Sequence, residues 1–374
     1  ADGLMHADLT PHPAMREVAW VHRPIAASLV GSKSSPRIRL KNRQAFRNSS
    51  WLTATFEIVV NGVVRRKGKL ACSEIGAGKS KQIKVPSIRG FSGDVRLNIF
   101  WRTKRAELWC DRGHLVAWDQ LTLKSSRLRK VAISKNRFEP IEVEPQLSLF
   151  RASIDNDGFK LLPNLAWVET TTLKRWQQQG LDQDECKLVQ HQTKRVVRSD
   201  GSVRFEYKVT IPRSLEDLPR IGVSFPLPEG FSEIAWWGNG PHECYPDRQS
   251  SAMLGIYSGQ ADELPYLVPQ EFGLRTNCRW FEVSNPRTKE IIRIESDGMP
   301  LHMSALPYTT HDLYQASDQT ELVKRSHLTM NIDVAHRGVG TASCGPDVLP
   351  QYRISAGEYR FAFVISQQPR AAYR

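Results

Sequence analysis

An Asn-Gly dipeptide at positions 61 and 62 separates two runs of strand-forming residues, and it constrains the local fold more than any other feature of the chain. The runs cover residues 52–60 and 63–70. Asn and Gly both tolerate the positive φ angles that a two-residue hairpin turn requires. The pattern therefore predicts an antiparallel β-hairpin over residues 52–70.

Further β-runs at 95–101 and 115–123 follow at a similar spacing, which is typical of a β-sandwich of about 100 residues. In Ile38-Arg39-Leu40-Lys41, basic and apolar residues alternate, as in a sheet with one solvated face. Trp51, Trp101 and Trp118 are predicted to lie in the core of this sandwich.

The second part of the chain also reads as strands, with only 171–180 and 308–314 having a helical pattern. The predicted strands cover 203–211, 221–227, 291–296, 327–334 and 359–365. Residues 204–210 alternate cleanly between polar and apolar. We therefore predict an all-β chain with two β-domains.

The formal net charge is +13, and much of the excess lies before residue 150. These basic residues alternate with strand formers, so we expect a solvated cationic surface and no nucleic-acid partner; nucleic-acid binding stays open as a third hypothesis.

No apolar run is long enough for a membrane span. The six cysteines form no Cys-x-x-Cys pair, which favours reduced thiols in a cytoplasm over disulfides or zinc.

Two motifs concentrate polar residues. Residues 236–248 read Trp-Trp-Gly-Asn-Gly-Pro-His-Glu-Cys-Tyr-Pro-Asp-Arg, and residues 269–275 read Pro-Gln-Glu-Phe-Gly-Leu-Arg. Buried charges persist only when they are paired. We therefore predict a structural ion network, whose members would be Glu243, Asp247, Arg248, Glu271 and Arg275. Structural turns with charged caps are the simpler alternative.

Together these motifs resemble the C-terminal small-chain domain of glycoside hydrolase family 2 β-galactosidases. Five other segments extend the resemblance in the family's order: 3–14, Gly-His-Leu-Val-Ala-Trp at 113–118, Arg-Ala-Ser-Ile-Asp-Asn-Asp at 151–157, and 336–340 and 355–359 near the end. Single motifs are weak, but their common order makes the resemblance specific.

The resemblance implies three regions. Residues 1–22 would be the tail of a catalytic barrel with a linker, 23–135 an immunoglobulin-like β-sandwich, and 136–374 a large antiparallel super-sandwich like that of sugar mutarotases. One departure is that 140–150 runs directly into the Asp-Asn-Asp loop, where the family has roughly thirty more residues. We expect the first strands of the super-sandwich to be missing, which would leave an exposed sheet edge and an incomplete core. Either another segment covers that edge or the chain is damaged or misassembled.

The resemblance also implies where the catalytic, substrate-binding and metal-binding residues lie. A retaining glycosidase needs two carboxyl groups about 5–5.5 Å apart, and the family places both on its barrel, so we expect no catalytic residue here and no activity of the chain alone. Substrate-cleft residues would be Asp157, Gly158 and Cys344, the last standing where the family has a sugar-stacking Trp. Asp2 falls near the family's monovalent-cation site, and that cation and Mg²⁺ are expected only in the complete enzyme.

Two functions from different classes are consistent with these observations. The first is the C-terminal portion or small subunit of a β-galactosidase, which joins a barrel-bearing partner, completes the β-galactoside cleft and supports an oligomer. The second is a stand-alone carbohydrate-binding β-sandwich module without catalysis. Sugar binding by the isolated chain would favour the second.

Overall fold

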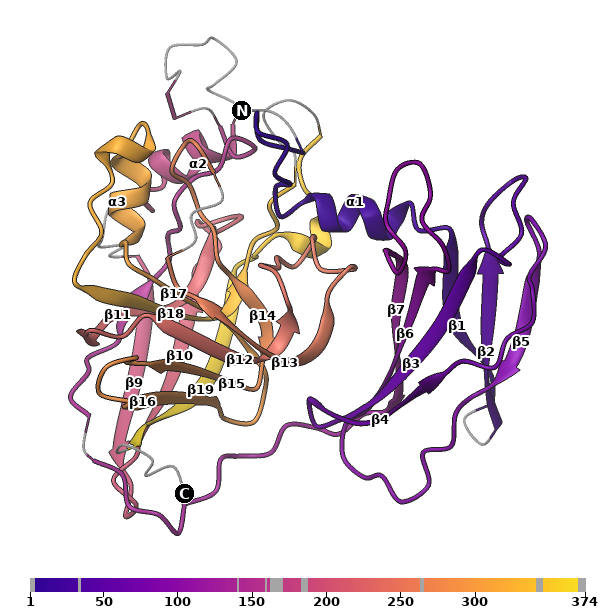
Figure 1. The fold of residues 1–374 in the computed structure, drawn as a ribbon. Helices are drawn as coiled ribbons and strands as arrows, with labels where there is room; N and C mark the ends of the chain where they lie inside the picture. The colour runs from indigo at the N-terminus through magenta and orange to yellow at the C-terminus, as the bar shows by residue number, and fades with distance from the viewer. Residues whose placement is uncertain are drawn as a thin grey trace. The chain divides into compact units, whose positions relative to one another are not determined.

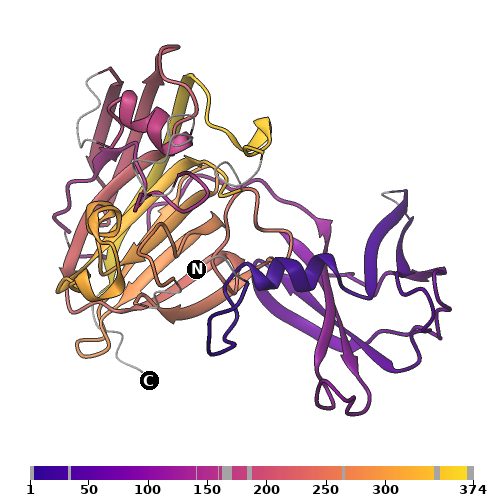
Figure 2. The ribbon, with the colours of Figure 1, turned by 90° about the horizontal axis from the view of Figure 1, so that it is seen from above.

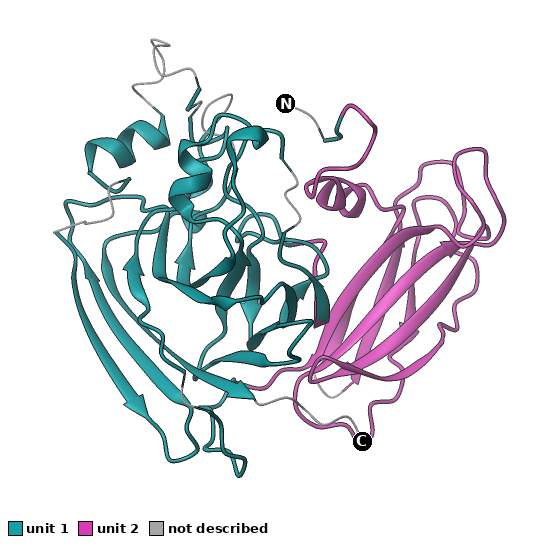
Figure 3. Cartoon of the chain, turned by 60° about the vertical axis from the view of Figure 1, so that its left-hand side comes forward, with its two compact units in different colours: residues 1–6, 127–249, 257–374 teal, residues 7–126, 250–256 magenta. Residues whose placement is uncertain are grey.

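The structure, a computed structural model, describes residues 4–32, 35–139, 141–158, 160–161, 171–182, 188–262, 266–340 and 346–368. The chain divides into two compact units (Figure 3). The smaller unit comprises residues 7–126 and 250–256, and the larger comprises 1–6, 127–249 and 257–374. Strands dominate both units (Figure 1), so the predicted all-β fold is confirmed.

Two antiparallel sheets form the smaller unit as an immunoglobulin-like sandwich. The three-stranded sheet has the order β1-β2-β5 and the four-stranded sheet the order β4-β3-β6-β7. The elements of this unit are α1 (Met15–Val21), β1 (Ile25–Ser32), β2 (Ser35–Asn42), β3 (Leu52–Val60), β4 (Val63–Lys69), β5 (Ser80–Lys84), β6 (Val95–Thr103) and β7 (Leu115–Lys124).

The predicted hairpin joins β3 and β4. Val60 pairs with Val63, and the two turn residues have positive φ, 49° at Asn61 and 83° at Gly62. The Asn61 side chain also accepts a hydrogen bond of 3.0 Å from the Asp94 N–H. The prediction is confirmed because both turn residues adopt the conformation for which Asn-Gly is selected.

Apolar residues from both sheets fill the core of the smaller unit. The alternation noted in β2 is present, with Ile38 and Leu40 fully buried between exposed basic residues. Trp101 and Trp118 are buried as predicted, whereas Trp51 is half-buried beneath the guanidinium of Arg47.

The larger unit packs a seven-stranded sheet, β13-β12-β15-β16-β19-β10-β9, against a five-stranded sheet, β14-β17-β18-β11-β8. Figure 2 shows these strands from above. The strands of these two sheets are β8 (Gln146–Ser148), β9 (Gln190–Val197), β10 (Val203–Ile211), β11 (Arg220–Glu229), β12 (Glu233–Gly240), β13 (Met253–Gln260, of which 257–260 belong to the larger unit), β14 (Arg275–Cys278), β15 (Trp280–Ser284), β16 (Ile291–Ser296), β17 (Leu301–Leu306), β18 (His327–His336) and β19 (Gly357–Gln368).

Alternating strands supply the core between these sheets. Along β10 every second residue is buried, and its aromatic rings stack on β19. The ring centroids of Phe205 and Phe363 are 5.4 Å apart, and those of Tyr207 and Phe361 are 5.1 Å apart. Each fully buried aromatic side chain contributes about 2–3 kcal/mol by leaving water, so this interface is a major source of stability.

Two short helices lie at one end of the sheets of the larger unit (Figures 1 and 3). They are α2 (Thr172–Gln178) and α3 (Thr310–Gln315), and both match the predicted helical segments. Thr171 caps α2, while Thr309 and Asp312 form a capping box on α3. The remaining elements are the short 3₁₀ turns η2 (Gln319–Glu321) and η3 (Pro350–Tyr352).

The edges of the two sheets differ in length. β8 has three residues and ends the five-stranded sheet through its pairing with β11. β9 ends the seven-stranded sheet, and all eight of its residues are exposed. Thr193, Arg195 and Val197 stand opposite the buried residues of β10, so the core-facing side of β9 is open to solvent.

Candidate functional site

The first polar cluster of the larger unit is centred on Glu243, which follows the Gly240-Pro241 turn after β12. Its carboxylate accepts hydrogen bonds from the Arg248 guanidinium, from the Tyr266 hydroxyl at 2.7 Å and from the Gly273 N–H at 2.7 Å. Glu243 is 5% exposed. The contacts join the 236–248 motif to the 269–275 motif.

The electrostatics of this cluster favour a charged pair. Burial would lower the pKa of Arg248, but the Glu243 carboxylate raises it above its ordinary value. Burial, with the negative charge of Glu243, raises the pKa of Tyr266. Arg248 is therefore cationic and Tyr266 neutral at pH 7, and Glu243 is an anchor held by three donors rather than a free nucleophile.

Asp247 and Arg275 lie apart from this pair. Asp247 accepts a hydrogen bond of 2.9 Å from the Val339 N–H, and a Cβ at Gly338 would come within 2.6 Å of its carboxylate. The Arg275 guanidinium lies 4.6 Å from the ring centroid of Trp236. Within the described part of the chain, no carboxylate comes within ion-pair distance of Arg275.

Glu271 belongs to a second buried cluster. Its carboxylate is 3.7 Å from Nε2 of His336, whose Nδ1 faces the Arg337 carbonyl at 2.9 Å. Burial raises the pKa of Glu271, but His336 and the nearby guanidinium groups lower it to below the ordinary value. Beside it, Arg220 donates from Nε to Asp333 at 3.0 Å. The five predicted network residues thus fall into several separate contacts.

A third cluster surrounds Asp157 in the Asp-Asn-Asp loop. Arg151 binds both oxygens of Asp157, at 2.7 and 2.9 Å, and Arg337 lies 3.7 Å away. Arg337 also pairs with Asp217 at 2.7 Å and with Asp347 at 2.5 Å. Asp157 has no exposed surface, so its carboxylate is part of an internal ion pair and does not face solvent.

Gly158 is buried beside Asp157. Its φ is 148°, and a Cβ there would lie 2.8 Å from Oγ1 of Thr171, the residue that caps α2. This glycine lets the loop approach the helix closely. The other two predicted site residues, Cys344 and Asp2, lie outside the described residues.

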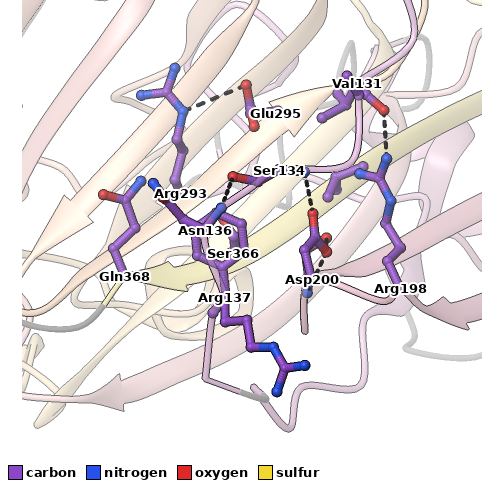
Figure 4. A pocket seen from close by; sticks show the side chains of 14 residues that line it. Val131, Ser134, Asn136, Arg137, Arg198, Asp200, Arg293, Glu295, Ser366 and Gln368 are labelled. Atoms are coloured by element: carbon purple, nitrogen blue, oxygen red, sulfur yellow. Dashed lines mark hydrogen bonds and ion pairs between the residues drawn. The ribbon is translucent and has the colours of Figure 1, made fainter.

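A polar pocket of about 460 Å³ lies over β16 and β19, between these strands, the turn at 198–202 that follows β9, and residues 131–138 (Figure 4). Its charged wall residues are Arg137, Arg198, Asp200, Arg293 and Glu295. Arg198 donates to the Val131 carbonyl at 2.7 Å, and Asp200 accepts from the Ser134 N–H at 2.7 Å. The pocket offers hydrogen-bonding groups but no pair of free carboxylates.

No group of three or more His, Cys, Asp or Glu residues in the described part of the chain is arranged to hold a metal ion. Among the described residues, Cys72, Cys110, Cys244 and Cys278 are not joined in disulfide bonds. None of the described helices is long and apolar enough to cross a membrane.

Sequence reasoning missed several members of these clusters. Asp217 and Asp347 both pair with Arg337, although they lie 120 and 10 residues away from it in the sequence, respectively. Tyr266 reaches Glu243 from a segment that carries no recognisable pattern. These partners come from loops without periodicity, so only the polar character of their side chains could have suggested a role.

Comparisons with known proteins agree with the motifs. The family model described as "Beta galactosidase small chain" matches residues 120–365, and that described as "Beta-galactosidase, domain 4" matches residues 38–124. A β-galactosidase of Arthrobacter sp. (strain B7) is 27% identical over 94% of this chain and 42% of its own length. One from Actinobacillus pleuropneumoniae is 26% identical over 97% of this chain and 40% of its own length.

Among solved structures, Amycolatopsis orientalis exo-chitosanase CsxA aligns with 79% of this chain and 28% of its own, with 10% identity and a TM-score of 0.24, a likeness too weak to carry an argument. The chain spans about 40% of the length of the curated relatives that it matches. Because the small-chain model covers well over half of the sequence, the chain belongs to the β-galactosidase small-chain family.

Proposed function

We propose that this chain is the C-terminal portion or small subunit of a β-galactosidase that hydrolyses terminal β-D-galactosyl residues. The observation that carries the proposal is the unbroken succession of the domain 4 match over 38–124 and the small-chain match over 120–365. The chain would complete the wall of the galactoside cleft and support oligomer contacts, and a barrel-bearing part would perform the chemistry.

The internal carboxylates support this division of labour. Asp157 is held by Arg151, Glu243 by Arg248, and Asp333 by Arg220. Double displacement at a sugar needs one carboxylate free to attack and a second to carry the proton. Carboxylates fixed by guanidinium groups in this way serve neither role, so catalysis is assigned to the barrel.

The monovalent cation and Mg²⁺ belong to the proposal only for the complete enzyme. The described residues offer no cluster of three or more metal-binding side chains. No step of the reaction is therefore assigned to a metal held by this chain.

Complementation tests the proposal. The purified chain should not turn over a chromogenic galactoside, whereas its co-expression with a barrel-bearing N-terminal part of a related β-galactosidase should restore turnover. A Gly222→Ala variant, in which the new Cβ would meet the Asp333 carboxylate at 2.0 Å, provides a folding-deficient control. Turnover by the chain alone, or a chain that fails to complement any barrel part, would refute the proposal.

The polar pocket over β16 and β19 favours a second candidate, a carbohydrate-binding module that acts without catalysis. Arg198, Asp200 and Gln368 bring guanidinium, carboxylate and amide groups to one cavity, and sugars are bound through such groups. Calorimetric titration of the chain with galactose and lactose distinguishes the two: saturable binding that Gln368→Ala weakens would favour the module.

A further inference from the structure

A set of four backbone carbonyls encloses the side-chain nitrogen of Lys160, three positions after Asp157. Nζ donates to the carbonyl oxygens of Pro269, Leu313 and Ala316, each at 2.7 Å, and to that of Tyr314 at 3.2 Å. We call these four carbonyls the carbonyl cage. All of its members and Lys160 belong to the larger unit.

The cage forms where helix α3 ends. The last carbonyls of a helix have no partner within the helix, and Leu313, Tyr314 and Ala316 supply three of them. Pro269 supplies the fourth, from the start of the 269–275 motif. The chain thus gathers partial negative charge at one point, and no carboxylate of the described residues contacts it.

An ammonium group fits this cage imperfectly. Ammonium has three N–H donors, and here four carbonyls compete for them, with Tyr314 the most distant at 3.2 Å. A spherical cation has no such limit, and rings of neutral carbonyls are how proteins replace the hydration shell of a monovalent ion. Because no carboxylate of the described residues contacts the cage, the cage favours a monovalent cation over a divalent one.

The environment supports a single cation at this point. Burial lowers the pKa of Lys160 to about 8, while the charges of Asp155 and Glu321 oppose that shift. At pH 7 the side chain therefore still carries its proton and occupies the cage as a cation.

From this geometry, we propose that the carbonyl cage is a monovalent-cation site that the chain occupies with its own ammonium group. Removal of the Lys160 charge should convert it into a binding site for free K⁺ or NH₄⁺. The occupied cage fastens the segment after the Asp-Asn-Asp loop to helix α3 and to the 269–275 motif, without a requirement for an external ion.

Thermal unfolding of full-length Lys160→Met in different salts tests this. Met keeps the length of the side chain and removes its charge. At equal ionic strength, KCl or NH₄Cl should raise the Tm of the variant above its value in choline chloride, saturably and by about 3–10 °C at a hundredfold excess over Kd. The wild type should show no such preference.

Lys324→Met is the matched control, because the Lys324 ammonium pairs with the Asp262 carboxylate at 2.8 Å on the surface and not with a carbonyl cage. Its Tm should be the same in KCl and choline chloride. If Lys160→Met loses stability equally in all salts, the cage does not bind a free cation and the proposal is refuted.

A wild-type measurement keeps the proposal testable if Lys160→Met does not fold. Mass spectrometry can follow acetylation of Lys160 and Lys324 by acetic anhydride in concentrated KCl or choline chloride. Potassium should compete for the cage and speed the modification of Lys160 but not of Lys324. Equal rates for Lys160 in the two salts would contradict the proposal.

Discussion

The Arg248 guanidinium and the Glu243 carboxylate form an ion pair across a turn that is closed by its own backbone. The Tyr245 N–H donates to the Arg248 carbonyl at 3.1 Å, and the Arg248 N–H donates to the Tyr245 carbonyl at 2.8 Å. The ion pair then ties this turn to Gly273 and Tyr266. The polar residues of the 236–248 motif thus hold the loop after β12 in one conformation.

Arg248→Ala should destabilise the larger unit by about 3 kcal/mol, because it leaves the buried Glu243 carboxylate without its cation. Chemical denaturation measures the loss. Arg275→Ala is the contrasting variant: it removes a cation–π contact with Trp236, worth roughly 1 kcal/mol, and strips no carboxylate of its partner. Equal losses for the two variants would contradict this assignment.

Asp157→Asn should destabilise the chain by about 3 kcal/mol, because Arg151 would lose its carboxylate partner inside the fold. The measurement is again the free energy of unfolding, compared with that of Asp155→Asn on the same loop, where Asp155 is part-exposed. A stability unchanged by Asp157→Asn, with altered sugar binding in a reconstituted enzyme, would instead support a direct role in the cleft.

Gly222→Ala should prevent stable folding of the larger unit. A Cβ at this position would lie 2.0 Å from the Asp333 carboxylate and 2.4 Å from the Ile332 carbonyl. Both strands would have to move apart, at a cost of about 3 kcal/mol or more. Gly259→Ala in β13 is the control, since a Cβ there would meet no described atom within 4 Å. Circular dichroism during heating should give this control a Tm close to that of the wild type.

Asp312 should contribute to acid sensitivity. Its hydrogen bonds with Arg325 lower its pKa to about 2, so its folded pKa lies below the unfolded value. The stabilisation is therefore complete above the unfolded pKa, near 4, and is lost as pH falls towards 2. The stability difference between wild type and Asp312→Asn, roughly 1 kcal/mol at pH 6, should shrink between pH 5 and pH 2; a constant difference would argue against the ion pair.

The strands were predictable where the sequence alternates or where a turn has a distinctive chemistry. Residues 203–211 and 291–296 match β10 and β16 end to end, and the Asn61-Gly62 hairpin has its expected register. Weakly patterned strands were missed. β9 is polar at most positions and exposed throughout, so it lacks the apolar period on which such predictions depend.

For the polar clusters, the sequence predicted some of the residues that take part but not the contacts that they make. The motifs indicated that Arg248 and Glu243 would be buried and charged, and the structure places them together. The sequence could not show that Arg275 would lie on an aromatic ring or that Lys160 would enter a carbonyl cage. Such contacts depend on loops brought together by the sheets, and no local pattern encodes them.

The exposed edge strand β9 carries Lys194 and Arg195 at its centre. If a second molecule added its own β9 antiparallel to it with Lys194 opposite Arg195, these cations would face one another across the new ladder, and like charges opposite each other oppose pairing. The edge is therefore protected against sheet-by-sheet growth into aggregates. Neutralising both residues should allow copies of the chain to associate through this edge.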